Sequence, residues 1–267
     1  MDLGLDGATA VVTGGTKGMG RAVAEVLAGE GARVVVMARG RAAMDETVEA
    51  LRRAGSPGAA GVAADFTDAS SIAEAFAELE RRWTALNILV HTVGPGAGTF
   101  EGLDDAGWDD AFTRGTMSGV RAVRAALPML RQAGWARVCT FGAVSIRRPN
   151  ARTVAYTAAK AALASMTKNL AKSLAPEGIL INCVCPGTIV TASFTEALRP
   201  ALVAENLDAG DPVSVMSWIG RNFHESAAIG RAGLPDEVAS LTAYLVSRRN
   251  GYVTGATVNV DGGTDFF

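Results

Sequence analysis

The residues Thr13-Gly14-Gly15-Thr16-Lys17-Gly18-Met19-Gly20 decide the fold of this 267-residue chain. They follow an apolar run at 8–13 that is typical of a buried strand, and they open a helical pattern at 20–29. Glycine permits a tight turn and a close approach of the backbone to a ligand, and the first amides of the helix face an anion. The segment therefore predicts a site for a dinucleotide pyrophosphate. A plain glycine-rich loop between strand and helix is the alternative.

The rest of the chain repeats this alternation of strand and helix. Short runs rich in valine and isoleucine predict buried strands at 8–13, 33–38, 61–64, 87–91, 137–141, 179–185 and 257–260. Helical patterns lie between them, at 20–29, 42–54, 70–83, 108–132, 154–174 and 236–247. The alternation predicts an α/β, single-domain Rossmann fold, with a doubly wound, seven-stranded parallel sheet and helices on both faces. Ligands are expected at the edge where the strands end.

Composition limits the partners and the cellular location. With 49% apolar residues, the chain can bury one large core, and we expect one domain over 1–267. A net charge of -2 without a basic block argues against nucleic acid. The longest apolar runs, such as 179–186, are too short to span a membrane, and no secretion signal is evident, so a cytoplasmic location is expected. Cys139, Cys183 and Cys185 are expected to be reduced thiols, and no metal site is predicted.

The end of the second predicted strand indicates the choice of cofactor. A carboxylate there would bind the ribose 2′-hydroxyl and repel a 2′-phosphate. The sequence has Arg39 and Arg41 instead, and Lys17 in the glycine turn adds a third cation. Guanidinium groups suit phosphate contacts, so we expect NADP(H) rather than NAD(H). The alternative is that these three cations are ordinary solvated surface charges with no role in cofactor binding.

Two further segments, Tyr156-Thr157-Ala158-Ala159-Lys160 and the run at 185–191, complete a pattern that extends over essentially the whole chain. With them, the sequence resembles the short-chain dehydrogenase/reductase family, and within it the 3-oxoacyl-[acyl-carrier-protein] reductases. On a helix, Tyr156 and Lys160 share one face. An ammonium group beside the phenol would lower its pKa and let Tyr156 exchange a proton with a carbonyl or carbinol oxygen. An amphipathic helix with an incidental tyrosine and lysine is the alternative.

The resemblance implies a role for each matching position. The glycine turn would surround the pyrophosphate and adenosine, Asp65 and Phe66 would contact the adenine, and Gly94 would pass near its ribose. The residues after the sixth strand would surround the nicotinamide, and Lys160 would hold its ribose. With Arg39, the predicted cofactor site is Gly14, Thr16, Lys17, Gly18, Met19, Gly20, Arg39, Asp65, Phe66, Gly94, Tyr156, Lys160, Pro186, Gly187, Ile189 and Thr191. The family also implies a homo-oligomer, a tetramer or a dimer.

The chain departs from the family pattern at catalytic positions. Ala143 stands where a serine is usual, and Ser145 would reach the same pocket if the loop stays extended; a serine satisfied by backbone is the alternative. Thr116 replaces an asparagine that helps to hold a water near the lysine. The predicted catalytic set is thus Tyr156, Lys160, Ser145 and Thr116. His91 ends a strand and is expected to bond to neighbouring backbone rather than to act as an acid or base. For His224 both interpretations stay open.

A polar and aromatic stretch at 194–229 is too long for an ordinary connection and predicts a lid. It carries Phe194, Met216, Trp218, Ile219 and Phe223, which would cover a bulky hydrophobic substrate; a subunit interface or core packing is the alternative. We expect an NADP(H)-dependent enzyme that interconverts a ketone and a secondary alcohol, on a 3-oxoacyl-type or cyclic ketone. The competing hypothesis is a cofactor-binding protein with little redox turnover, a sensor or an assembly subunit, because Ala143 and Thr116 replace the usual residues.

Overall fold

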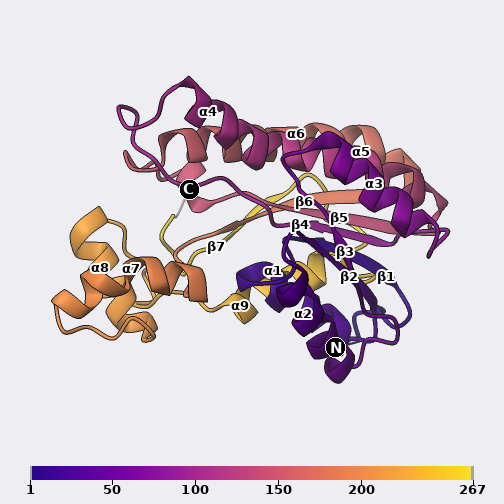
Figure 1. Ribbon diagram of the computed structural model, residues 1–267, viewed down its shortest axis with the longest axis horizontal. Helices are drawn as coiled ribbons and strands as arrows, with labels where there is room; N and C mark the ends of the chain where they lie inside the picture. Colours follow the sequence, from indigo (N-terminus) through magenta and orange to yellow (C-terminus); the bar gives the residue numbers. More distant parts are fainter. Residues whose placement is uncertain (1, 266–267) are drawn as a thin grey trace.

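In the computed structural model, which describes residues 2–265, seven strands form one sheet in the order β3-β2-β1-β4-β5-β6-β7 (Figure 1). Every pair of neighbouring strands in it is parallel. The strands are β1 (Thr9–Thr13), β2 (Arg33–Ala38), β3 (Ala60–Ala63), β4 (Ile88–His91), β5 (Ala136–Phe141), β6 (Ile179–Pro186) and β7 (Thr257–Val260). This arrangement confirms the predicted Rossmann fold, and each strand lies within one residue of its predicted limits.

Helices cover both faces of the sheet (Figure 1). They are α1 (Gly18–Gly29), α2 (Arg41–Ala54), α3 (Ala69–Glu80), α4 (Asp105–Phe112), α5 (Ser118–Gln132), α6 (Val154–Leu174), α7 (Ala192–Ala204), α8 (Pro212–Phe223) and α9 (Pro235–Leu245). Side chains alternate along each strand, so Val12 packs in the core shared with α1, α2 and α9, whereas Val11 packs in the core shared with α3 and α5. Burial on both faces explains why these strands read as continuous apolar runs.

The strand order reverses at β1, which pairs with both β2 and β4. Thr13, the last residue of β1, is in register with Met37 on one side and His91 on the other. The segments that follow β1 and β4 leave the sheet in different directions, which opens a crevice at the carboxyl ends of these strands. The glycine turn lies at this point.

The single helix predicted at 108–132 is wrong in one respect. The chain forms α4, then a π-helical turn at Thr113–Met117, and then α5. A Cβ atom at Gly115 would lie 2.7 Å from Ala159 Cβ, so this turn packs tightly on α6. A π turn inserts one residue into a helix, and apolar periodicity does not reveal that insertion. π turns frequently occur at functional sites.

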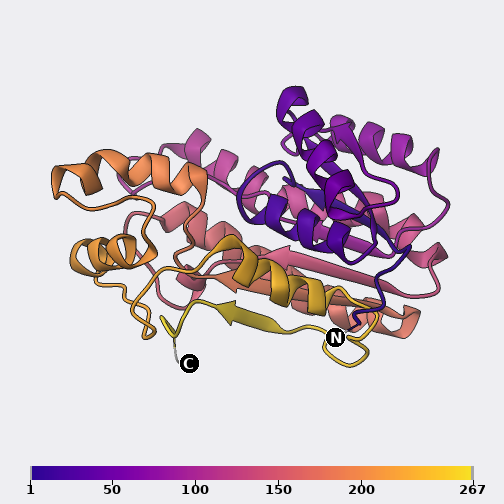
Figure 2. The same cartoon turned by 90° about the horizontal axis from the view of Figure 1, so that it is seen from below.

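The predicted lid forms the helices α7 and α8, which project together at one end of the molecule (Figures 1 and 2). Met216, Trp218 and Ile219 are buried in a core of the lid's own, with Phe194 and Phe223 packed at its edge. The expectation that all five side chains face a substrate is therefore wrong. An amphipathic helix pair buries its own apolar stripe first, which leaves only the two phenylalanines partly exposed. No helix within residues 2–265 is long and apolar enough to cross a membrane.

We expect Leu202→Ala to loosen the lid without unfolding the sheet. Leu202 is fully buried in the lid core, so its truncation leaves a cavity that costs about 2–5 kcal/mol locally. Hydrogen exchange should accelerate at 192–223 and stay unchanged in β1 and β4. The neighbouring Val203, which is 60% exposed, supplies the control Val203→Ala. Equal loss of protection in the lid and the sheet would contradict a separate lid core.

Candidate active site

A cleft of about 940 Å³ lies at the carboxyl ends of β1, β2 and β4. It brings together most of the residues predicted to hold a dinucleotide, namely Gly14, Thr16, Lys17, Gly18, Met19, Gly20, Arg39, Asp65, Phe66, Gly94 and Thr191. Its lining also includes Thr92, Val93 and Arg114, which sequence reasoning missed. Only the position of Thr92 and Val93, directly after a predicted strand, pointed to them; nothing in the sequence pattern marked Arg114.

The glycine turn is packed as closely as a phosphate-binding backbone requires. A Cβ atom at Gly20 would lie 2.5 Å from the carbonyl oxygen of Gly14 and 2.6 Å from Thr92 Oγ1. Gly14 and Gly18 have φ angles of +71° and +55°, which side chains disfavour. Only glycine therefore fits here, and α1 begins at Gly18 with its first amides at the cleft. These features fit the pyrophosphate of a dinucleotide.

Positive side chains border the far end of the cleft. Lys17 and Arg39 are exposed there, and Arg39 forms no ion pair within residues 2–265. Hydrogen bonds from Thr67 hold the pKa of the Asp65 carboxyl below its usual range, and the charges of Arg39 and Arg114 act in the same direction. Arg41 begins α2 and is not part of the cleft lining. Arg39 is thus the guanidinium available to a 2′-phosphate.

Lys160 is buried behind the lining of the cleft and, like Tyr156, is not part of that lining. Its Nζ atom donates to the carbonyl oxygens of Phe141 at 2.6 Å and Val93 at 3.2 Å, at the ends of β5 and β4. A Cβ atom at Gly94 would lie 3.2 Å from that Nζ, so glycine leaves room for the lysine beside the cleft lining. Burial lowers the pKa of Lys160 to about 8, so the ammonium form still predominates at neutral pH.

Tyr156 lies four residues earlier on α6, but its pKa differs from the prediction. Burial, with a smaller contribution from Cys185, raises the pKa of Tyr156 to about 12. The expected lowering by Lys160 is wrong for this structure. The lysine is bonded to two backbone carbonyls, and loss of water around the phenol disfavours the phenolate. Tyr156 is therefore a phenol at neutral pH.

The other two predicted catalytic residues lie on either side of α6. Ser145 is in a 3₁₀ turn at Val144–Ile146, so the loop is not extended as expected. Its Oγ accepts a hydrogen bond from Thr157 Oγ1 at 2.9 Å, which leaves the serine proton available to another acceptor. Thr116 Oγ1 donates to the carbonyl oxygen of Ala159 at 2.8 Å. Its proton is therefore used to join the π turn to α6 rather than to reach Lys160.

The segment after β6 is only partly at the cleft. Thr191 lines it and caps α7, accepting from the amide of Phe194 at 3.3 Å. Pro186, Gly187 and Ile189 are outside the lining of the cleft. Ile189 is buried and pairs with Gly233, so this segment ties β6 to the start of the lid.

His91 joins three parts of the site. Its Nδ1 lies 2.9 Å from Thr13 Oγ1, and its Nε2 lies 3.0 Å from Ser118 Oγ. Ser118 donates its only proton to the carbonyl of Arg114, so it accepts from Nε2–H, and Thr13 donates to Nδ1. The expectation of backbone partners is wrong, since both partners are hydroxyls. Neither ring nitrogen is free for acid or base chemistry.

Comparison with known proteins agrees with this geometry. A family model described as enoyl-(acyl carrier protein) reductase matches residues 14–265. The short-chain reductase protein NovJ of Streptomyces niveus is 34% identical over 95% of this chain and 92% of its own. The 3-oxoacyl-[acyl-carrier-protein] reductase FabG of Escherichia coli is 30% identical over 98% of each chain. The crystal structure of L-sorbose reductase from Gluconobacter frateurii, in complex with NADPH and L-sorbose, superposes with a TM-score of 0.91 at 28% identity, covering 99% and 98% of the two chains.

The fold and the cleft define a Rossmann-type protein of the dinucleotide-binding class. The chain belongs to the short-chain dehydrogenase/reductase family, as the resemblance of its motifs indicated.

We expect His91 to make the protein less stable as the pH falls from 6.5. Burial lowers the pKa of His91 from 6.5 to about 3. Between these two pH values the unfolded chain therefore binds a proton that the native chain does not bind. The stabilisation is complete above pH 6.5 and falls by about 1.4 kcal/mol per pH unit below it, or about 2 kcal/mol by pH 5. Denaturant unfolding at pH 7 and pH 5 measures this loss.

His91→Gln should be less stable at pH 7 and should lose most of this pH dependence. His224→Gln, at the exposed end of α8, is the control and should keep the slope of the unsubstituted protein. An unchanged slope in the His91 variant would contradict a neutral, buried imidazole.

Proposed function

We propose that this protein is an NADP(H)-dependent oxidoreductase that interconverts a ketone and a secondary alcohol. The observation that carries the proposal is the contact of Lys160 with Val93 and Gly94 in the lining of a glycine-rich cleft, with Tyr156 on the same helix. Lys17 and Arg39 at the other end suit a 2′-phosphate, and the related L-sorbose reductase was crystallised with NADPH. The cofactor of the chain is accordingly NADP(H).

Tyr156, Lys160 and Ser145 each have a separate role in carbonyl reduction. Bound NADPH supplies a hydride for the carbonyl carbon. Tyr156 holds its proton at neutral pH because its pKa is about 12, and it gives that proton to the carbonyl oxygen as negative charge develops there. The Lys160 ammonium, held by the ends of β4 and β5, contributes positive charge next to the site. The loop of Ser145 forms a 3₁₀ turn rather than an extended segment, but the hydrogen bond from Thr157 holds the serine near Tyr156. Its uncommitted proton donates a second hydrogen bond to the same oxygen in place of the serine absent at Ala143.

The substrate that we propose is a fairly bulky ketone with an apolar body, of the 3-oxoacyl or cyclic type. The lid supports this size, because α7 begins at the cofactor cleft and α8 returns toward the connection between β5 and α6. Phe194 and Phe223 are the lid aromatics left partly exposed for contact. The name of the relative FabG, a 3-oxoacyl-[acyl-carrier-protein] reductase, agrees with reduction of such carbonyl compounds. A dimer or tetramer is proposed from family membership.

The competing hypothesis of a sensor or assembly subunit with little redox turnover is not favoured. It rested on Ala143 and Thr116, but Tyr156 and Lys160 are retained, and the relatives are named as reductases.

We expect Arg39→Gln to weaken NADPH binding at least about tenfold and NADH binding less than twofold. Only NADPH carries a 2′-phosphate, so only NADPH loses a charged hydrogen bond when the guanidinium is removed. Calorimetric titration of both nucleotides measures the two Kd values. Arg41→Gln is the matched control, since Arg41 is outside the cleft lining. Tighter binding of NADH than of NADPH by the unsubstituted protein would overturn the cofactor assignment.

We expect Tyr156→Phe to lower kcat at least about a hundredfold on any accepted ketone, because the acid is lost, while NADPH binding is preserved. Ser145→Ala should lower kcat at least about tenfold. Tyr244→Phe, on α9, is the control and should leave kcat unchanged. Unchanged turnover in the Tyr156 variant would remove the proposed acid. Binding of NADPH without oxidation across a broad ketone panel would instead support the cofactor-binding protein.

A further inference from the structure

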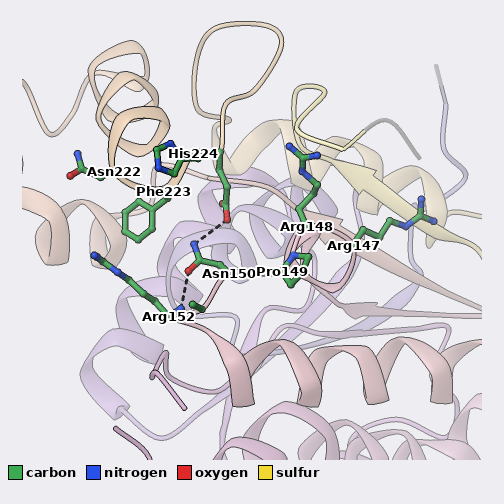
Figure 3. A pocket seen from close by; sticks show the side chains of 10 residues that line it. Arg147, Arg148, Pro149, Asn150, Arg152, Asn222, Phe223 and His224 are labelled. Carbon is green, nitrogen blue, oxygen red and sulfur yellow. Dashed lines mark hydrogen bonds between the residues drawn. The ribbon is translucent and has the colours of Figure 1, made fainter. Parts of the chain in front are cut away.

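A second pocket, of about 570 Å³, lies between the connection from β5 to α6 and the end of α8 (Figure 3). Residues 147–152 form one wall, and residues 222–225 form the other. Asn150 Nδ2 donates to Glu225 Oε1 at 3.0 Å and links the two walls. His224, whose role the sequence left open, ends α8 with a left-handed φ of 56° and lines the same pocket.

The pocket carries more positive charge than its acids neutralise. Three arginines, Arg147, Arg148 and Arg152, occur within six residues of its wall. Arg147 lies 3.6 Å from the buried carboxylate of Asp265. Glu225 is the acid in the lining, and its hydrogen bond comes from Asn150 rather than from an arginine. Within residues 2–265, Arg148 and Arg152 have no acidic partner, although folded proteins commonly pair such clustered cations.

Arg152 is held in place by an aromatic ring instead of an acid. Its guanidinium carbon lies 4.8 Å from the centre of the Phe223 ring, and Figure 3 shows the two side chains side by side. Stacking occupies the face of a guanidinium and leaves its N–H edge open. Asn150 Oδ1 accepts from the amide of Arg152 at 2.9 Å, and the carbonyl of Arg152 accepts from Gly98 at 3.0 Å, so the backbone is held as well. An ordered guanidinium with an open edge suits a carboxylate or a phosphate.

This pocket is within reach of a substrate bound at Tyr156. Arg152 precedes Tyr156 by four residues, so their Cα atoms are at most about 14 Å apart. Ser145 precedes Arg147 by two residues on the same connection. The arginines therefore belong to the segment that joins two of the proposed catalytic side chains. The long side chains of Arg152 and Tyr156 shorten this distance, so that a ketone with a charged group several bonds from its carbonyl can contact both.

We propose that the pocket binds an anionic group, a carboxylate or a phosphate, carried by the ketone substrate, with Arg152 as its ligand. This inference rests on the proposed function, because it assumes that the carbonyl lies at Tyr156. The apolar body of the substrate contacts Phe223, and its charged end bridges the arginine loop to the end of α8. Binding of the anion thereby holds the lid against the catalytic helix.

The test compares each of two anionic ketones with a neutral counterpart. Steady-state NADPH oxidation is measured with 4-oxopentanoate and its methyl ester, and with dihydroxyacetone phosphate and dihydroxyacetone. The unsubstituted protein should prefer at least one anionic member over its neutral partner. Arg152→Gln should lower kcat/KM for the preferred anion at least about tenfold, mainly through KM, and change the neutral partner less than twofold. The two pairs separate a carboxylate from a phosphate ligand.

The controls for the loss of one charge are Arg148→Gln, whose side chain points away from Arg152 in Figure 3, and Arg52→Gln, on the remote helix α2. Isothermal titration of 4-oxopentanoate and inorganic phosphate into the NADPH-bound protein measures binding without turnover, and at least one should bind more weakly to the Arg152 variant. Equal effects of Arg152→Gln on charged and neutral ketones, or no anion preference in the unsubstituted protein, would overturn the proposal. If the anion site is overturned in this way, turnover of neutral ketones that is lost in Tyr156→Phe would still support the proposed function.

Discussion

The parallel pairing of β1 with both β2 and β4 determines where the whole site lies. Because every strand runs in the same direction, each strand ends at one edge of the sheet, and the two segments that diverge there open the crevice. The glycine turn enters it from β1, Arg39 from β2 and Gly94 from β4, and Lys160, on the helix after β5, lies behind Val93 and Gly94. Burial of the sheet on both faces leaves this edge as the place where polar side chains can gather.

Buried polar contacts then hold the loops of this edge in register. His91 links the end of β1, through Thr13, to Ser118 at the start of α5, and Ser118 continues to the π turn that carries Arg114 into the cleft. Lys160 links α6 to the ends of β4 and β5. Each of these groups would be costly to bury without its partner, so the network specifies one arrangement of the cleft. The three arginines between Ser145 and Tyr156 add positive charge beside the end of α8 in the lid.

The predictions succeeded where one local rule was enough and failed where two elements compete. Apolar runs located all seven strands, and the glycine spacing located the cofactor cleft. The same reasoning treated Met216, Trp218 and Ile219 as free to meet a substrate, although they pack against one another. It assigned Tyr156 a lowered pKa because Lys160 is one turn away, whereas burial, with a smaller contribution from Cys185, raises that pKa. The π turn and Arg114 had no signal in the periodicity at all.

The sequence by itself determined the class of fold, the place of the glycine turn at the strand ends and the spacing of Tyr156 and Lys160 on one helix. These features follow from backbone conformation, strand and helix periodicity and spacing along one helix, all of which are local. Only the tertiary structure decided which groups face each other. It paired His91 with hydroxyls, buried Trp218 with Met216 and Ile219 in the lid and brought Phe223 over Arg152. Hydrogen-bond partners, desolvation and cation–π contacts arise between segments distant in the chain, so no pattern of neighbouring residues contains them.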